Sequence, residues 1–152
     1  MDSGRVSEIK KAMPIILTVQ GLPIAQPRHR TACRGGFPKH YIPSDHAIHA
    51  WKKKVSEAAA KSSDGVIEGA IKVDCLFVFA ASKKNMRGQY KISKPDIDNL
   101  IKGILDSLNE ILWVDDAQVC EIHAAKMFGV EPYAVIRIES IDFPVTDALE
   151  TT

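Results

Sequence analysis

The sequence predicts an α+β domain with a small mixed β-sheet and two main helices. Two observations support this class. Short segments rich in β-branched and apolar residues are interspersed with two longer segments of helical periodicity. Their order is strand, loop, helix, strand, loop, helix, strand and strand, which differs from the regular alternation of a parallel α/β fold. The chain of 152 residues is long enough to bury a hydrophobic core as a single domain.

Four segments have the composition of strands, and two others have that of loops. The expected strands span 14–20, 70–80, 118–128 and 133–141. The first long connection, 21–43, is rich in proline, glycine and basic residues, which predicts a loop or a loose hairpin. The second, 82–94, carries five basic residues and little apolar content, so we expect a mobile basic loop.

Both expected helices show apolar residues at intervals of three and four. The first spans about 44–61, with Ser44 or Asp45 as a possible N-cap. The second spans about 99–111, where Asp98 is well placed to cap the helix. Its leucines and isoleucines define one buried stripe.

The ends of the chain differ from its middle. We expect an N-terminal extension at 1–13, one folded domain at 14–143 and a flexible polar tail at 144–152. No apolar run is long enough to span a membrane, and the start lacks the apolar core of a signal peptide. Three cysteines without CxxC spacing indicate neither a disulfide framework nor a zinc knuckle. A cytoplasmic location is therefore expected.

The net charge of +1 conceals two oppositely charged halves. Residues 28–94 hold 14 Lys and Arg against 5 Asp and Glu, a net charge of +9. Residues 95–152 hold 3 against 12, a net charge of −9. Such an arrangement suggests that the basic half holds a polyanion while metal bound by the acidic half acts on it.

The acidic residues gather in the segment 94–118, KPDIDNLIKGILDSLNEILWVDDAQ. Asp96 and Asp98 precede the second helix, and the pair Asp115 and Asp116 follows it. Carboxylates held close together repel each other, and Mg²⁺ offsets this by taking carboxylate, water and phosphate oxygens as ligands. The second acidic pair can return to the first if the next strand runs back beside the helix. The segment therefore predicts a metal site for phosphate chemistry.

Structural explanations compete with this interpretation. Asp98 could serve only as a helix cap, Lys102 could be an ordinary solvated lysine, and Asp115 with Asp116 could form a plain turn. An EF-hand is excluded by Leu100 and Ile101, which stand where its loop needs a ligand and a glycine. No phosphate-cradling glycine motif is present, and the histidine and cysteine spacing matches no zinc finger. The element order also does not fit a receiver-like phosphoacceptor domain.

The motifs KPDIDNLIKGILDSLN and LWVDDAQV resemble those of the RusA-type Holliday junction resolvases. This resemblance implies a RusA-like fold and a homodimeric, Mg²⁺-dependent endonuclease that cuts four-way DNA junctions, with Mn²⁺ as a substitute ion. It also implies a bacterial protein, encoded by a phage or prophage in many cases.

The resemblance also suggests residue roles. Asp96, Asp98 and Asp116 match the metal-binding aspartates, and Lys102 matches the catalytic lysine. Asp106 falls on a further acidic position of the motif, to which no role is assigned. From the charge distribution we expect DNA-backbone contacts from Arg28, Arg30, Lys83, Lys84, Arg87 and Lys94.

The alternative function is a non-catalytic dimeric DNA-binding protein whose acidic cluster is structural. Such a protein would bind junctions equally well with and without a chelator, and it would not cleave them.

Overall fold

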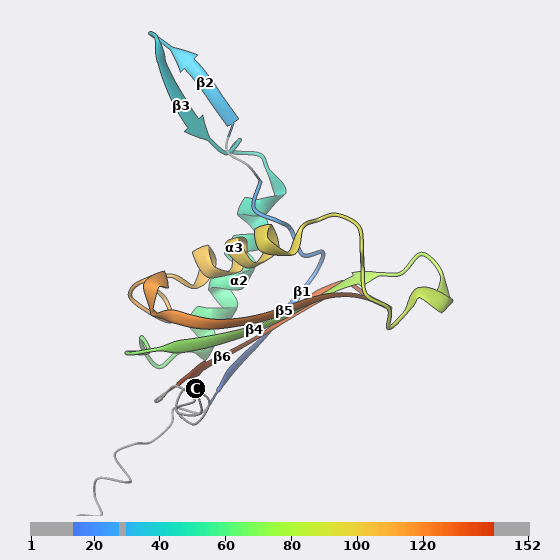
Figure 1. Cartoon of the computed structure of the whole chain (residues 1–152). Helices are drawn as coiled ribbons and strands as arrows, with labels where there is room; N and C mark the ends of the chain where they lie inside the picture. The colour runs from blue at the N-terminus through green and yellow to red at the C-terminus, as the bar shows by residue number, and fades with distance from the viewer. Residues whose placement is uncertain (1–13, 28–29, 142–152) are drawn as a thin grey trace, which may run out of the picture.

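The computed structural model describes residues 14–27 and 30–141, and its centre is a four-stranded mixed sheet. The strand order is β1 (Ile15–Gln20), β6 (Tyr133–Ser140), β4 (Ile71–Ala80) and β5 (Val119–Gly129). β4 and β5 are parallel, and the other neighbours are antiparallel. Two α-helices of the described part, α2 (Ala47–Ser62) and α3 (Ile97–Leu108), lie on one face of this sheet (Figure 1). The predicted α+β class with a mixed sheet and two helices is confirmed.

A separate hairpin occupies part of the proline- and glycine-rich connection. β2 (Arg30–Arg34) pairs antiparallel with β3 (Phe37–Tyr41) and extends away from the sheet and helices (Figure 1). Gly35 and Gly36 link the strands with φ of 64° and 83°, the left-handed values that a tight two-residue hairpin turn requires. This confirms the hairpin as the form that the connection takes.

The hydrophobic core lies between the helices and the sheet. Alternate residues of β4, among them Val73 and Phe77, point into it and are fully buried. Both helices bury one stripe, and the segment after α3 adds Leu112 and Trp113. The fully buried helix residues are Ile48, Val55, Ala59, Leu100, Ile104 and Leu108.

The two helices begin at different residues from those predicted. α2 is capped by His46, whose Nδ1 accepts a hydrogen bond from the Ile48 N–H at 3.0 Å. α3 is preceded by Asp96 in the N-cap position, so Asp98 lies in its first turn instead of capping it. There the Asp98 carboxylate accepts from the Asn99 N–H at 2.9 Å, close to the positive end of the helix dipole.

The basic segment 82–94 is attached to the sheet instead of being a free loop. After the short 3₁₀ turn η1 (Lys84–Met86), the Gly88 N–H donates to Phe128 O at 2.9 Å. The Phe128 N–H donates to Gln89 O at 2.9 Å, and the Lys91 N–H donates to Lys126 O at 3.0 Å. The prediction of a mobile loop is therefore wrong for this part, because its backbone pairs with the outer edge of β5.

The two cysteines whose environments are described are both free thiols. Burial, with a smaller contribution from the charge of Asp74, raises the pKa of the Cys75 thiol to about 12. Cys120 is exposed. In the described ranges, no helix is long and apolar enough to cross a membrane. The predicted extension 1–13 and tail 144–152 lie outside the described residues.

We expect Ile104→Ala to lower the free energy of unfolding by about 2–5 kcal/mol, because the Ile104 side chain is fully buried where α3 packs on the core. Urea unfolding followed by circular dichroism measures this. Ile92→Ala is the matched control, since Ile92 is 97% exposed, and it should change stability by less than about 0.5 kcal/mol. Equal losses in both variants would contradict the described packing of α3.

Candidate active site

The first acidic pair lies on an exposed turn at the start of α3. Asp96 occupies the N-cap position and Asp98 the first helical turn, and both side chains are exposed to solvent. The positive end of the helix dipole lies here and interacts favourably with negative charge. Lys94 adds a surface ion pair, with its Nζ 3.4 Å from Asp96 Oδ2. We refer to residues 93–98 as the acidic turn.

Lys126 of β5 holds the backbone at the start of the acidic turn. Its Nζ donates to the carbonyl oxygens of Ser93 and Pro95, each at 2.8 Å. The Lys94–Pro95 peptide bond between these two contacts is cis. Sequence reasoning did not identify Lys126, although a charged residue between Ala124 and Phe128 on the helix-facing side of a strand is an unusual choice.

Lys102 lies one helical turn beyond Asp98 on the exposed flank of α3, as the four-residue spacing predicted. Asp106, one turn further along, pairs with Lys52 of α2, with 3.5 Å between Lys52 Nζ and Asp106 Oδ2. That contact joins the two helices at the surface. It gives Asp106 a structural partner some distance from the acidic turn.

The segment after β1 packs against the first half of α3. The Gln26 N–H donates to Asn99 O at 2.9 Å. Gly103 faces this segment, and a Cβ there would lie 3.7 Å from Ile24 O and 3.8 Å from Gln26 N. These are ordinary van der Waals distances, so the segment lies directly against this face of the helix. Residues 22–27 support the end of α3 that carries Asp98 and Lys102.

The second acidic pair lies at the opposite end of α3. Asp116 begins the 3₁₀ turn η2 (Asp116–Gln118), and its Oδ1 accepts from the buried Trp113 Nε1–H at 2.8 Å. β5 does run back beside α3, but both aspartates precede the strand and stay where it begins. The predicted return of Asp115 or Asp116 to Asp96 and Asp98 therefore does not occur within one chain.

Asp115 and Gln118 have structural roles in this turn. The Asp115 carboxylate accepts from the Ala117 N–H at 3.0 Å, and Gln118 Oε1 accepts from the Asp115 N–H at 3.1 Å, which forms a capping box. Gln118 Nε2 also donates to the carbonyl oxygens of Ile67 and Gly69 at 2.8 and 3.0 Å. Gln118 of the LWVDDAQV motif thus ties the start of β5 to the segment before β4.

One chain therefore supplies the carboxylates of Asp96 and Asp98 at the acidic turn and, one helical turn further along α3, the ammonium group of Lys102. Among the residues that the structure describes, no group of three or more His, Cys, Asp or Glu side chains could hold a metal ion. Mg²⁺ sites in nucleic-acid enzymes commonly use one or two carboxylates together with substrate phosphates and water. Asp96 and Asp98 fit this minimal donor set.

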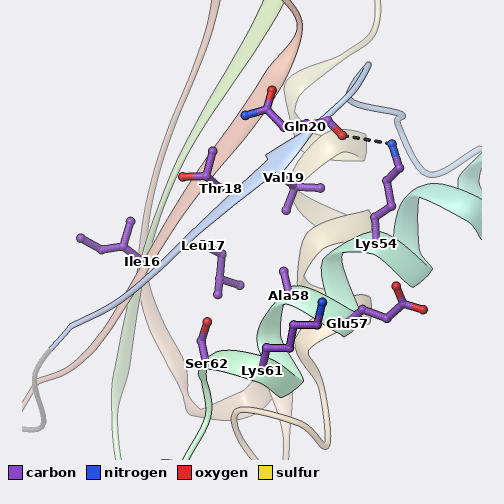
Figure 2. Close-up of a pocket in the computed structure, with 10 residues that line it drawn as sticks. All are labelled: Ile16, Leu17, Thr18, Val19, Gln20, Lys54, Glu57, Ala58, Lys61 and Ser62. Carbon is purple, nitrogen blue, oxygen red and sulfur yellow. Dashed lines mark hydrogen bonds between the residues drawn. The ribbon is translucent and has the colours of Figure 1, made fainter.

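Two cavities lie away from the acidic turn. A groove of about 470 Å³ runs between β1 and α2, where Lys54 Nζ donates to Gln20 O at 3.1 Å (Figure 2). A second cavity of about 370 Å³ is lined by residues of β4, β5 and β6, among them Asp74, His123 and Arg137. Neither includes Asp96, Asp98 or Lys102, so the turn suits a large substrate that approaches from outside.

The expected DNA-contact residues are distributed over two elements. Lys83, Lys84, Arg87 and Lys94 are exposed on the segment that leads into the acidic turn. Arg30 begins β2 of the projecting hairpin, and Arg28 lies outside the described residues.

Comparison with known proteins identifies the family. The model of the family "Endodeoxyribonuclease RusA" matches residues 20–139. The chain belongs to the RusA endodeoxyribonuclease family. It is therefore an endodeoxyribonuclease, and the non-catalytic alternative is not supported.

Two relatives are similar to the chain over different lengths. The uncharacterized protein YqaN of Bacillus subtilis (strain 168) is 28% identical over 139 residues, which cover 84% of this chain and 96% of the relative. The crossover junction endodeoxyribonuclease rusA of Lactococcus phage r1t is 33% identical over 58 residues, which cover 38% of this chain and 44% of that protein.

We expect Lys126→Met to loosen the acidic turn, because it removes both hydrogen bonds to Ser93 O and Pro95 O while keeping a long apolar stem. Limited trypsin digestion followed by mass spectrometry measures this as faster cleavage after Lys91. Cleavage after Lys72, which is paired with both β5 and β6 at the start of β4, is the internal control and should not change. If cleavage after Lys91 is as slow as in the wild type, Lys126 does not hold the turn.

Proposed function

We propose that this endodeoxyribonuclease resolves four-way DNA junctions by Mg²⁺-dependent hydrolysis, as a homodimer that makes paired, symmetric nicks. The supporting observation is the acidic turn, in which Asp96 and Asp98 project from a rigid helix start beside a basic segment. Lys102 lies one turn away on the same helix. Family membership and the junction-cleaving name of the phage relative agree with this substrate.

Asp96 and Asp98 would hold the ion through carboxylate oxygens. When bound, Mg²⁺ supplies Lewis-acid activation of water and stabilisation of negative charge on the phosphate. Lys102 would approach the same phosphate from the next helical turn and neutralise charge that develops on its oxygens. Because α3 is packed in the core through Leu100, Ile104 and Leu108, these groups are held in place before the substrate arrives.

The basic residues would position the DNA without reading its sequence. Lys83, Lys84, Arg87 and Lys94 lie on the exposed segment that leads into the acidic turn, where they can contact phosphates on either side of the scissile bond. Backbone contacts of this kind fix the register of the substrate but do not distinguish bases. Selectivity must then come from the shape of the junction.

A dimer offers a way to bring Asp116 to the metal. The 12 residues of α3 span about 18 Å, which separates Asp116 from Asp96 in one chain. A two-fold axis across the middle of α3 would set the helices of two chains antiparallel. The partner subunit's Asp116 would then lie near Asp96 and Asp98. Val114, 66% exposed beside Asp116, provides apolar surface for such a contact.

We expect Asp96→Asn and Asp98→Asn each to slow junction cleavage by about 10²-fold or more, because each removes a charge that the ion and the transition state require. Binding should be retained or tighter, since negative charge near DNA is lost. Cleavage of a synthetic four-way junction with Mg²⁺ and with a chelator measures the effect. Asp106→Asn is the matched control and should cleave at near the wild-type rate, because its carboxylate pairs with Lys52.

We also expect Asp98→Asn and Asp116→Asn proteins to be inactive alone but to recover nicking when their subunits are mixed. A mixed dimer with shared sites carries both changes in one site and leaves the other site intact. If each site were built from one chain, every subunit would carry a damaged site and the mixture would stay inactive. A supercoiled cruciform plasmid reports the result, since one intact site gives nicked circles and two give linear product.

A further inference from the structure

Ile92 has the highest exposure of the large hydrophobic side chains of the described residues, at 97%. Tyr90, two residues before it, is 71% exposed. Single exposed apolar side chains are common on protein surfaces and need no special explanation. Ile92 differs from such cases because its backbone is held on both sides, and because it lies between the basic segment and the acidic turn.

The backbone on both sides of Ile92 is anchored to Lys126. The Lys91 N–H donates to Lys126 O at 3.0 Å, and Lys126 Nζ donates to Ser93 O at 2.8 Å. The Lys91 side chain is fixed as well. Its Nζ lies 5.3 and 5.2 Å from the ring centroids of Phe79 and Phe128 and donates to Ser93 Oγ at 2.8 Å. The side chain of Ile92 is thus exposed and apolar, while hydrogen bonds hold the backbone on both sides of it.

The position of Ile92 relates it to the site of cleavage. It precedes Asp96 by four residues, so their Cα atoms are separated by at most about 14 Å. Positively charged side chains surround it in the sequence: Lys83, Lys84, Arg87, Lys91 and Lys94. A phosphate backbone held by these charges at the acidic turn would bring bases close to Ile92.

We propose that Ile92, assisted by Tyr90, packs as an apolar wedge against the base pairs at the branch point of the junction. Apolar side chains inserted at base steps unstack and kink DNA, and aromatic side chains stack on exposed bases of any sequence. A continuous duplex has every base pair stacked, whereas strand exchange at a junction interrupts this stacking. Ile92 would therefore select the branched structure close to the scissile phosphate. This inference rests on the proposed function.

Fluorescence of a junction with 2-aminopurine at the branch point tests the wedge directly. The full-length protein is added in a chelator, so that unstacking is measured without cleavage. Wild-type protein should raise the fluorescence by unstacking the probe, and Ile92→Ser should abolish most of this rise. Ile92→Leu, which keeps the apolar volume, should restore it. Val66→Ser, another exposed apolar position at 47%, lies near the far end of α3 and should behave as wild type.

The same substitution of Ile92 should also reduce the preference of the protein for binding junctions over linear duplex. We expect Ile92→Ser to weaken junction binding on the order of tenfold relative to binding of a matched linear duplex, which it should leave unchanged. Tyr90→Ala should give a smaller loss in the same direction.

Several results would overturn the wedge while leaving the proposed function intact. In the first, wild-type protein cuts junctions, but Ile92→Ser protein raises the 2-aminopurine fluorescence as much as the wild type does. Another is loss of dimer assembly in Ile92→Ser with an unchanged fluorescence rise, which would make Ile92 a contact between subunits. Wild-type protein that neither binds nor cuts junctions would instead overturn the proposed function, and the wedge with it.

Discussion

The parallel pairing of β4 with β5 determines where every candidate catalytic residue lies. Two adjacent parallel strands require a connection that returns to the starting edge, and α3 provides it. The chain leaves β4 at one end of the sheet, where the acidic turn forms, and α3 carries it back to the other end. β5 then starts beside Ile71, with Asp116 just before it. The crossover thus separates Asp116 from Asp96 and Asp98 by the length of the helix.

The spacing of apolar residues, alternating in the strands and every three or four residues in the helices, was enough to predict the class of the fold. Val73 and Phe77 mark one face of β4, and Leu100, Ile104 and Leu108 mark the buried stripe of α3; both patterns arise from burial and appear directly in the sequence. The helix starts were less predictable. His46 caps α2 although Ser44 and Asp45 are nearby, because the choice among adjacent polar residues depends on the path of the preceding loop.

The positions of Asp98 and Lys102 in the fold were predictable from the sequence, but the distance of Asp116 from them was not. The motif placed Asp98 and Lys102 on one flank of a helix, and the fold agrees. The position of Asp116 depends on which way the strand after α3 pairs, and this long-range choice has no local signal. Lys126 was missed for a similar reason, since its partners are backbone carbonyl oxygens more than 30 residues away.

The two outer strands of the sheet are protected in different ways. Gly88 to Lys91 pair with the free edge of β5, whereas at β1 the Lys54 ammonium group binds Gln20 O and places a charge beside the strand (Figure 2). An unprotected strand edge is a template for association with other chains, and lysine is one of the residues that discourage it. From the charge of Lys54 beside the end of β1 we expect that replacing this residue lowers the yield of soluble protein before it affects catalysis.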